Sequence, residues 1–234
     1  MRLKIHGNSP HPDVADSYNN IGNVYRSMGD YGSSMSYYQK SLAIRLKIHG
    51  DSPHPDVAAS YNNNGIVYRS QGDYNSAMDY HQKALNIQLK IHGDSPHPHI
   101  AGSYNNIGNV YQLQGDCSSA MDYYQKALNI QLEPRGSSPH PTMFRSYIGI
   151  GTVYHAQGSF SSALDSYQKA LAATSSSNPQ FAPLLISSLI LVVRADMEEL
   201  IYSTVSFLTV CRNLISQYFH LPYNTPNYLS IGLY

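Results

Sequence analysis

Histidines gather between the apolar stretches of this 234-residue chain, and they are the residues best suited to metal chemistry. His49 stands five positions before His54, and His92, His97 and His99 follow a similar arrangement further along. Imidazole nitrogens can coordinate a divalent ion. These histidines fall in apparent loops, however, and we identify no carboxylate or cysteine fixed beside them. We therefore expect no metal site and no cofactor, and we keep metal binding as the alternative.

Motifs for catalysis are missing from the chain. It contains no His-Glu-x-x-His, no Gly-x-Ser-x-Gly and no phosphate-binding glycine loop, and no histidine stands near Cys117 or Cys211 in sequence. We therefore predict no catalytic residues and no enzyme activity. The two widely spaced cysteines indicate a reducing compartment rather than a disulfide framework. The first thirteen residues lack the apolar stretch of a signal peptide, so we expect a cytoplasmic protein.

The composition limits the classes of partner. Fifteen basic and fifteen acidic residues give a formal net charge of zero, so no long-range field would concentrate nucleic acid around the chain. Charged residues make up 13% of the sequence, against a usual share of about 25%, and the chain carries 21 tyrosines. The 42% of hydrophobic residues are enough for a packed core.

A segment of fifteen residues recurs four times at intervals of 43 residues. It reads HPDVADSYNNIGNVY from His11, HPDVAASYNNNGIVY from His54, HPHIAGSYNNIGNVY from His97 and HPTMFRSYIGIGTVY from His140. A fixed period in this range is typical of stacked repeats, because one such unit cannot bury its own apolar face. The period therefore predicts an elongated array rather than a single compact core.

Each repeat is predicted to contain two amphipathic helices, because its apolar and small residues fall at helical spacing. Proline and an acidic residue mark the start of a first helix, and Gly29-Asp30 and its counterparts mark a turn before the second. We predict first helices at 12–28, 55–71, 98–114 and 141–157. Second helices are predicted at 31–48, 74–91, 117–133 and 160–174.

The pattern resembles the tetratricopeptide repeat signature of an aromatic residue, Leu-Gly and Tyr on the first helix, followed by Ala, an aromatic residue and Ala on the second. The third repeat shows it as Tyr104, Ile107-Gly108, Tyr111, Ala120, Tyr124 and Ala127. Long second helices, a His-Pro-Asp-Val-Ala start and a Tyr-Asn-Asn sequence are similar to the kinesin light chain and nephrocystin-type subgroup. The resemblance implies an all-α fold, a right-handed α-solenoid of four repeats with a C-terminal helical cap.

The repeat boundaries divide the chain into seven segments. We predict the end of a truncated preceding repeat at 1–10, repeats at 11–53, 54–96, 97–139 and 140–178, a divergent helical cap at 179–219 and an irregular tail at 220–234. The apolar run at 181–193 is too short to span a membrane, for which about 20 residues are needed. For the C-terminal part, an aberrant tail remains the alternative to a cap.

Three residues depart from the repeat pattern. Asn64 occupies a core position that isoleucine fills in the other repeats, and His81 replaces a tyrosine. We expect the Asn64 amide to be hydrogen-bonded locally, or the second repeat to be less stable. Pro134 is expected to end the third long helix about one turn early.

A second, polar stripe runs along the first helices beside the buried one. In the family that the chain resembles, this stripe faces the concave groove and binds extended peptides, and asparagine amides suit that task because each offers a donor and an acceptor. The resemblance thus implies a peptide-binding groove, with inert polar surface as the alternative. The predicted groove residues are Asn19, Asn23, Arg26, Asn62, Arg69, Asn105, Asn109, Gln112 and His155.

The function that follows is a non-enzymatic scaffold, an adaptor similar to the cargo-binding array of kinesin light chains. Its arginines and amides predict a neutral to mildly acidic protein or peptide ligand, with no nucleic acid and no membrane span. The alternative is a self-associating spacer or sensor segment of a larger signalling protein, whose tyrosine-rich faces would stack on other copies.

Overall fold

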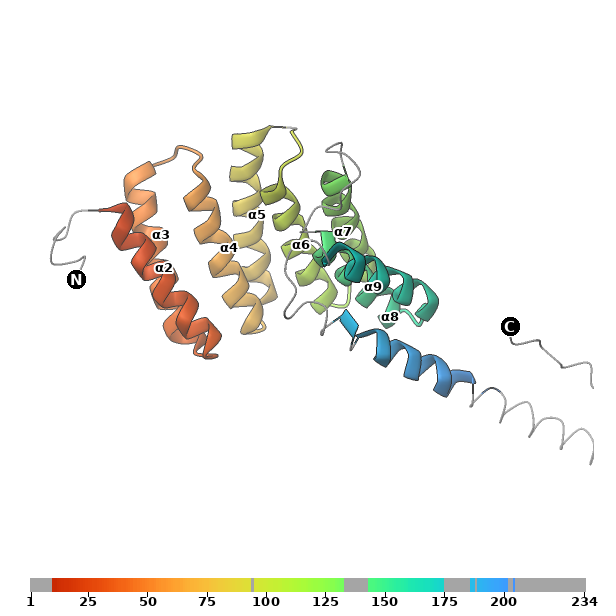
Figure 1. Cartoon of the computed structure of the whole chain (residues 1–234). Coiled ribbons are helices and arrows are strands. Elements are labelled where there is room, and N and C mark those ends of the chain that lie inside the picture. Colours follow the sequence, from red (N-terminus) through yellow and green to blue (C-terminus); the bar gives the residue numbers. More distant parts are fainter. Residues whose placement is uncertain are drawn as a thin grey trace, which may run out of the picture.

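The computed structural model describes residues 10–93, 95–132, 143–174, 186–187, 189–201 and 204. All regular elements in these ranges are helices, and they form successive antiparallel pairs (Figure 1). The first helices are α2 (Pro12–Ser27), α4 (Pro55–Ser70), α6 (Pro98–Leu113) and α8 (Met143–Ala156). The second helices are α3 (Tyr31–His49), α5 (Tyr74–His92), α7 (Cys117–Leu132) and α9 (Phe160–Thr174).

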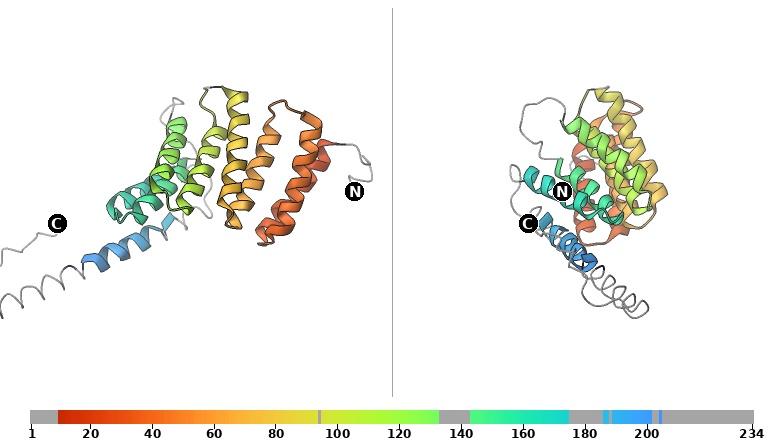
Figure 2. Two further views of the ribbon diagram at one scale, coloured as in Figure 1. Left: turned by 180° about the vertical axis from the view of Figure 1, so that it is seen from behind. Right: turned by 90° about the vertical axis from the view of Figure 1, so that its right-hand side faces the viewer.

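The predicted all-α solenoid is confirmed, and the helices begin and end within one or two residues of their predicted bounds. Each second helix packs on its own first helix, and α3, α5 and α7 also pack on the first helix of the next repeat, so the pairs continue as one array (Figure 2). The predicted effect of Pro134 on the third long helix, and most of the predicted segments at either end of the chain, lie outside the described residues.

The turn between the helices of a repeat forms as its residues predict. Gly29 adopts φ +79°, a left-handed conformation that glycine reaches without strain, and ends α2. Asp30 then accepts a hydrogen bond from the backbone N–H of Ser33 at 3.0 Å and caps α3. The same glycine and aspartate recur before α5 and α7.

Histidine, rather than proline alone, marks the start of α2, α4 and α6. The Nδ1 atoms of His11 and His54 accept hydrogen bonds from the backbone N–H groups two residues later, both at 3.2 Å. His97 does the same at 3.3 Å. The imidazole thus satisfies one of the free N–H groups of the first turn, and proline follows at a position that needs no N–H donor.

Inside each repeat a glycine of the first helix lies against a ring of the second. A Cβ atom at Gly22 would come within 2.7 Å of the Tyr38 ring, and one at Gly108 within 2.8 Å of the Tyr124 ring. Tyr38 and Tyr124 are almost completely buried. The Leu-Gly position of the repeat signature therefore lets the two helices approach closely enough to enclose the ring.

Other tyrosines of the first three repeats also pack within their own repeat. Tyr37 of α3 contacts both Tyr18 and Tyr25 of α2, with ring centroids 5.9 and 5.5 Å apart. Equivalent triplets form around Tyr80 in the second repeat and Tyr123 in the third. The tyrosines of these triplets thus form contacts between the two helices of one repeat.

A polar contact recurs where one repeat meets the next. The Arg45 guanidinium of α3 donates to the hydroxyl of Ser60 on α4 at 2.8 Å. At the following junction Ser103 donates to the side-chain oxygen of Gln88 at 2.7 Å. One position on the second helix and a serine on the next first helix therefore set the register between repeats.

The described residues of the C-terminal segment pack against the fourth repeat. Ile186 and Val193 are buried with Ala163, Tyr167 and Ala170 of α9. This covers part of the end of the array, which is what the predicted cap would do, and the extent of that cap stays a prediction. Among the described residues, no helix is long and apolar enough to cross a membrane.

Candidate peptide-binding face

The first helices lie side by side along one face of the array. Helix α4 contacts α6 directly and α6 contacts α8, whereas no two second helices in the described ranges touch to a similar extent. Because the first helices approach each other more closely, the array curves toward them. The predicted groove residues all come from these helices, so the fold gathers them on one surface.

The asparagines of this surface bond sideways to the next repeat. Asn63 donates to the Oδ1 atom of Asn19 at 2.7 Å, across the junction between α2 and α4. Between α4 and α6, Asn62 donates to Ser103 at 3.3 Å and accepts from Asn106 at 3.4 Å. These side chains form a polar ladder that joins consecutive first helices.

Three more of the predicted groove residues also have partners inside the protein. Asn23 and Asn109 each accept a hydrogen bond from the buried tyrosine of their own repeat at 2.7 Å. Asn105 accepts from Ser146 at 3.0 Å and is 4% exposed, which makes it the least accessible of the set. The stripe is therefore structural as well as exposed, and its role in binding stays a prediction.

The last two repeats continue the ladder. Gln112 donates to the Thr152 hydroxyl at 2.9 Å, from α6 to α8. His155 of α8 pairs with Asp196 of the C-terminal segment, with 2.6 Å between its Nε2 atom and the carboxylate oxygen Oδ2. The C-terminal segment thus occupies the ladder position that a fifth first helix would take, and it covers His155.

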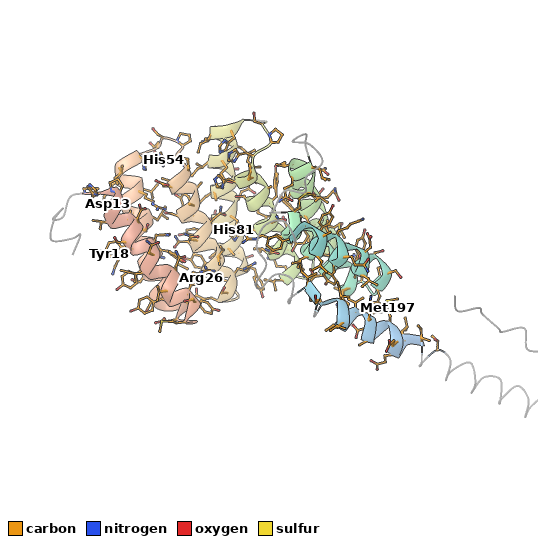
Figure 3. The ribbon with its side chains drawn as sticks, in the orientation of Figure 1. Asp13, Tyr18, Arg26, His54, His81 and Met197 are labelled. Atoms are coloured by element: carbon orange, nitrogen blue, oxygen red, sulfur yellow. The ribbon has the colours of Figure 1, made fainter. Side chains whose placement is uncertain are left out.

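Arg26 and Arg69 carry the positive charge of this surface. Arg69 of α4 is half-buried, and no carboxylate of the described residues forms an ion pair with it. Burial lowers the pKa of its guanidinium, and the charge of Arg26 on the neighbouring α2, which Figure 3 labels, lowers it further. The acidic Asp16, in contrast, is already paired with Arg45 at 2.8 Å. Positive charge on this face is therefore left without a counter-ion.

The second repeat differs beside Arg69. His81 is fully buried, and its Nδ1 atom lies 3.0 Å from the Asn62 oxygen, so in the tautomer that fits this contact Nδ1 donates. The Nε2 atom of His81 then has no hydrogen-bond partner. Burial lowers the pKa of His81 to about 4, and Arg69 contributes to that shift. The ring is therefore neutral at physiological pH.

The predicted local hydrogen bond of Asn64 is present for half of the amide. Its nitrogen donates to the carbonyl oxygen of Ser60 at 2.9 Å, while its oxygen is buried without a partner.

A pocket of about 340 Å³ lies beside the first half of α4. Its lining comes from α4, α5 and the start of α6: Pro55, Asp56, Ala59, Asn62, Asn63, Gln88, Ile91, His92 and His99.

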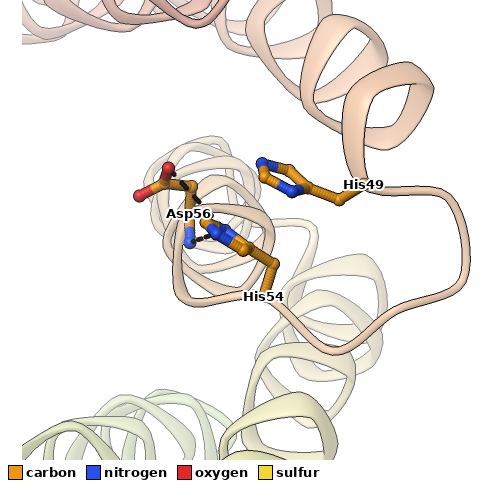
Figure 4. A group of neighbouring side chains, drawn as sticks. All are labelled: His49, His54 and Asp56. Carbon is orange, nitrogen blue, oxygen red and sulfur yellow. Dashed lines mark hydrogen bonds and ion pairs between the residues drawn. The ribbon is translucent and has the colours of Figure 1, made fainter.

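The histidines at the junction of the first two repeats do have a carboxylate beside them. The rings of His49 and His54 stack with centroids 3.5 Å apart, and Asp56 lies next to His54 on the first turn of α4 (Figure 4). The reason for expecting no metal was thus wrong on this point. Sequence reasoning missed Asp56 because it was assigned only to the helix start.

Stacked helix pairs that share a polar first-helix face define an α-solenoid repeat protein. The family model described as tetratricopeptide repeat matches three overlapping ranges, 13–90, 56–133 and 99–176, which together span more than half of the chain. The chain belongs to the tetratricopeptide repeat family. Members of this family are generally non-enzymatic scaffolds that hold other proteins. Comparison with curated proteins gives no match.

Solved structures with the same fold include kinesin light chain-like proteins. A putative kinesin light chain from Podosopora anserina with nearly identical TPR-like repeats is 20% identical, with a TM-score of 0.62 over 88% of this chain and 97% of the other. BtubC (BKLC) from P. vanneervenii is 24% identical, with a TM-score of 0.60 over 73% of this chain and 68% of the other. At these identities the likeness supports the fold alone.

Proposed function

We propose that the chain is a scaffold that binds an extended peptide along its first-helix face, and that the peptide carries an acidic side chain for Arg69. The tetratricopeptide fold supports a protein partner. The half-buried guanidinium of Arg69, which lacks a carboxylate partner among the described residues, is the observation that carries the charge preference. A cation that has lost part of its hydration gains most from a ligand that supplies the missing negative charge.

The surroundings of Arg69 strengthen this preference. Arg26 adds a second positive charge from the neighbouring repeat, and Asp16 is paired with Arg45. His81 behind Arg69 is neutral, so it neither repels nor replaces an acidic ligand. The half-exposed Asn23 uses its side-chain oxygen to accept from Tyr38, which leaves its side-chain nitrogen to donate to the carbonyl groups of a peptide backbone.

A peptide array probed with the full chain tests the proposal. Each ten-residue peptide should be present in four forms, with a central Glu, Gln, Lys or phosphoserine, so that only charge varies at the position under test. We expect retention of a subset of sequences in the Glu form and its loss in the Lys form. Equal retention of all four forms would contradict the charge preference, and no saturable binding by any peptide would contradict the groove.

A polyanion control separates a peptide site from general attraction to negative charge. A single-stranded oligonucleotide of the same net charge as the best peptide should bind at least tenfold more weakly, because the face supplies few cations and the whole chain has a net charge of zero. Comparable affinity for the oligonucleotide would favour a nucleic-acid partner instead.

Self-association is the second candidate, and exposed apolar side chains favour it. Leu191, Val192, Leu200 and Ile201 of the C-terminal segment are each at least half exposed. Tyrosines of the first three repeats pack within their own repeats, so these exposed apolar side chains are the better candidates for a contact between copies. Sedimentation velocity from 1 to 100 μM tests the idea, and a Leu191→Glu, Leu200→Glu double variant should abolish any dimer seen.

A further inference from the structure

We propose that the junction between the first two repeats binds a divalent zinc ion through His49, His54 and Asp56. One potential ligand atom from each of these side chains lies within 4.8 Å of the other two. Two imidazoles and one carboxylate are a ligand set that zinc accepts, with water in the remaining position. The site lies at the junction between two repeats and does not include the proposed peptide contacts of Arg69.

The separation of the ligand atoms suits coordination. His54 Nδ1 and Asp56 Oδ2 are 3.7 Å apart. Zinc–ligand bonds of about 2.0–2.2 Å place two ligands of a tetrahedral ion about 3.4 Å apart, so an ion fits between these two atoms with little movement. His49 comes from the opposite side of the junction, and Figure 4 shows its ring facing that of His54. The ligand nitrogen of this half-exposed side chain lies within 4.8 Å of the other two ligand atoms, and zinc binding would draw it closer.

Helix capping explains the presence of His54 but not that of His49. The Nδ1 lone pair of His54 accepts the backbone N–H of Asp56, so this nitrogen is already unprotonated and directed toward the first turn of α4. The side chain of His49 forms no hydrogen bond with any described residue and contacts the His54 ring instead. Two imidazoles held face to face beside a carboxylate would have a chemical function if all three coordinated one metal ion.

Binding an ion at Nδ1 displaces one capping hydrogen bond. A lost cap of this kind weakens a helix start by roughly tenfold in equilibrium terms. Three coordinate bonds outweigh that loss, because each ligand of a zinc site contributes more than a single neutral hydrogen bond. The cap therefore reduces the affinity for zinc without preventing its binding.

The neighbouring groups hold the site in place and set its charge. The Arg45 guanidinium donates to the backbone carbonyl of Asp56 at 2.9 Å and also pairs with Asp16, which fixes the first turn of α4 to the first repeat. The ion would lie between the C-terminal end of α3, whose dipole favours a cation, and the N-terminal end of α4, whose dipole opposes one. These two effects offset each other, so the Asp56 carboxylate decides the sign of the local field. Lys47 in the last turn of α3 is exposed to solvent.

The next junction repeats the histidine stack with a different third residue. His92 and His97 stack with centroids 3.5 Å apart, and His99 takes the place of the aspartate. Unlike Asp56, His99 brings no negative charge to offset that of the ion. It is therefore an internal comparison for the first junction, and we expect it to bind zinc more weakly.

Zinc titration of the full chain tests the site. Protein freed of metal by chelation would be titrated with zinc chloride at pH 7.5 in a His92→Ala background, which removes the second junction from the measurement. His49→Phe keeps a ring on His54 but removes the ligand nitrogen, and it should weaken binding by about tenfold or more. The visible spectrum with cobalt in place of zinc should lose intensity in the same variant.

A pair of matched aspartate variants gives the control. Asp56→Asn removes the proposed ligand charge and should weaken binding about tenfold, whereas Asp51→Asn makes the same charge change in the loop just before α4 and should alter it less than twofold. Circular dichroism of the metal-free variants confirms that each is folded. Parental affinity in His49→Phe, or equal losses in the two aspartate variants, would overturn the proposal.

Discussion

The second and third repeats share one backbone but complete their cores differently. In the third repeat the hydroxyl of the buried Tyr124 lies 2.7 Å from the side-chain oxygens of both Asn109 and Gln112 and donates its one hydrogen to either of them. In the second repeat the equivalent ring is His81, whose Nδ1 atom contacts Asn62 and whose Nε2 atom has no partner. The two rings fill the same space against a glycine, but only the tyrosine satisfies its polar atom.

Two further positions differ between the second and third repeats in the same way. Ile107 is completely buried in the third repeat, and Asn64 takes that place in the second with its oxygen unsatisfied. Asn109, which accepts the tyrosine hydroxyl, is matched by Ile66, which cannot. The loss of the tyrosine hydroxyl is thus accompanied by the loss of its acceptor. The comparison teaches that a repeat keeps its shape through the glycine and ring contact while its polar contacts vary.

The largest effect is expected from moving the asparagine into the third repeat. Ile107→Asn removes a buried apolar side chain, at about 1.5–3 kcal/mol, and buries an amide without full hydrogen bonding, at about 1–3 kcal/mol. The free energy of unfolding should fall by about 3 kcal/mol or more in urea denaturation. A loss below about 1 kcal/mol would show that the core of the array tolerates amides generally.

The next largest effect is the pH dependence of the free energy of unfolding, which His81 gives to the second repeat alone. His81 has its pKa lowered to about 4 by burial and by Arg69, so the unfolded chain takes up a proton near pH 6.5 that the folded chain refuses until about pH 4. The free energy of unfolding should therefore decrease by about 3 kcal/mol as the pH falls through this window. His81→Phe should remove that part of the slope, and an unchanged slope would contradict the burial of a neutral imidazole.

A gain in stability is expected from the reverse exchange. Asn64→Ile replaces an amide whose oxygen is unpaired with the residue found at the same position in the first, third and fourth repeats. The free energy of unfolding should rise by about 1–2 kcal/mol. Thermal denaturation checks this, with Asn129→Ile on the exposed face of α7 as a control that should give no comparable gain. Destabilisation by Asn64→Ile would mean that the amide is satisfied in solution.

The smallest effect concerns the tyrosine hydroxyl. Tyr124→Phe keeps the ring against Gly108 and removes the hydrogen bonds to Asn109 and Gln112. We expect a loss of about 1 kcal/mol in the free energy of unfolding, because a net hydrogen bond contributes about that much. A loss above about 3 kcal/mol would show that the hydroxyl, rather than the ring, holds the two helices together.

The sequence predicted the helices because their signals are local and repeated. Glycine at Gly29, the capping Asp30 and the proline at Pro12 act within a few residues of each other, so their consequences can be read without a structure. Four copies in phase then fixed the period of the array. The polar stripe was found for the same reason, since helical spacing alone places Asn19 and Asn62 on one side of their helices.

The partners of the stripe could not be predicted from spacing. The bond between Asn19 and Asn63 depends on how far neighbouring first helices are shifted along each other, and that shift is set by junction contacts such as Arg45 with Ser60. The imidazole cap of His54 was missed because histidine is not among the usual capping residues.

The binding of an acidic peptide by the first-helix face is tested most directly by one affinity measurement. Fluorescence anisotropy would compare the best Glu-containing peptide from the array on the parent chain, on Arg69→Gln and on Arg194→Gln, which removes the same charge from an exposed position on the C-terminal segment. We predict a loss of about tenfold or more for Arg69→Gln and less than twofold for Arg194→Gln, because a half-buried charge without an ion-pair partner contributes more than a solvated one. Equal affinities of all three proteins for the peptide would contradict the account.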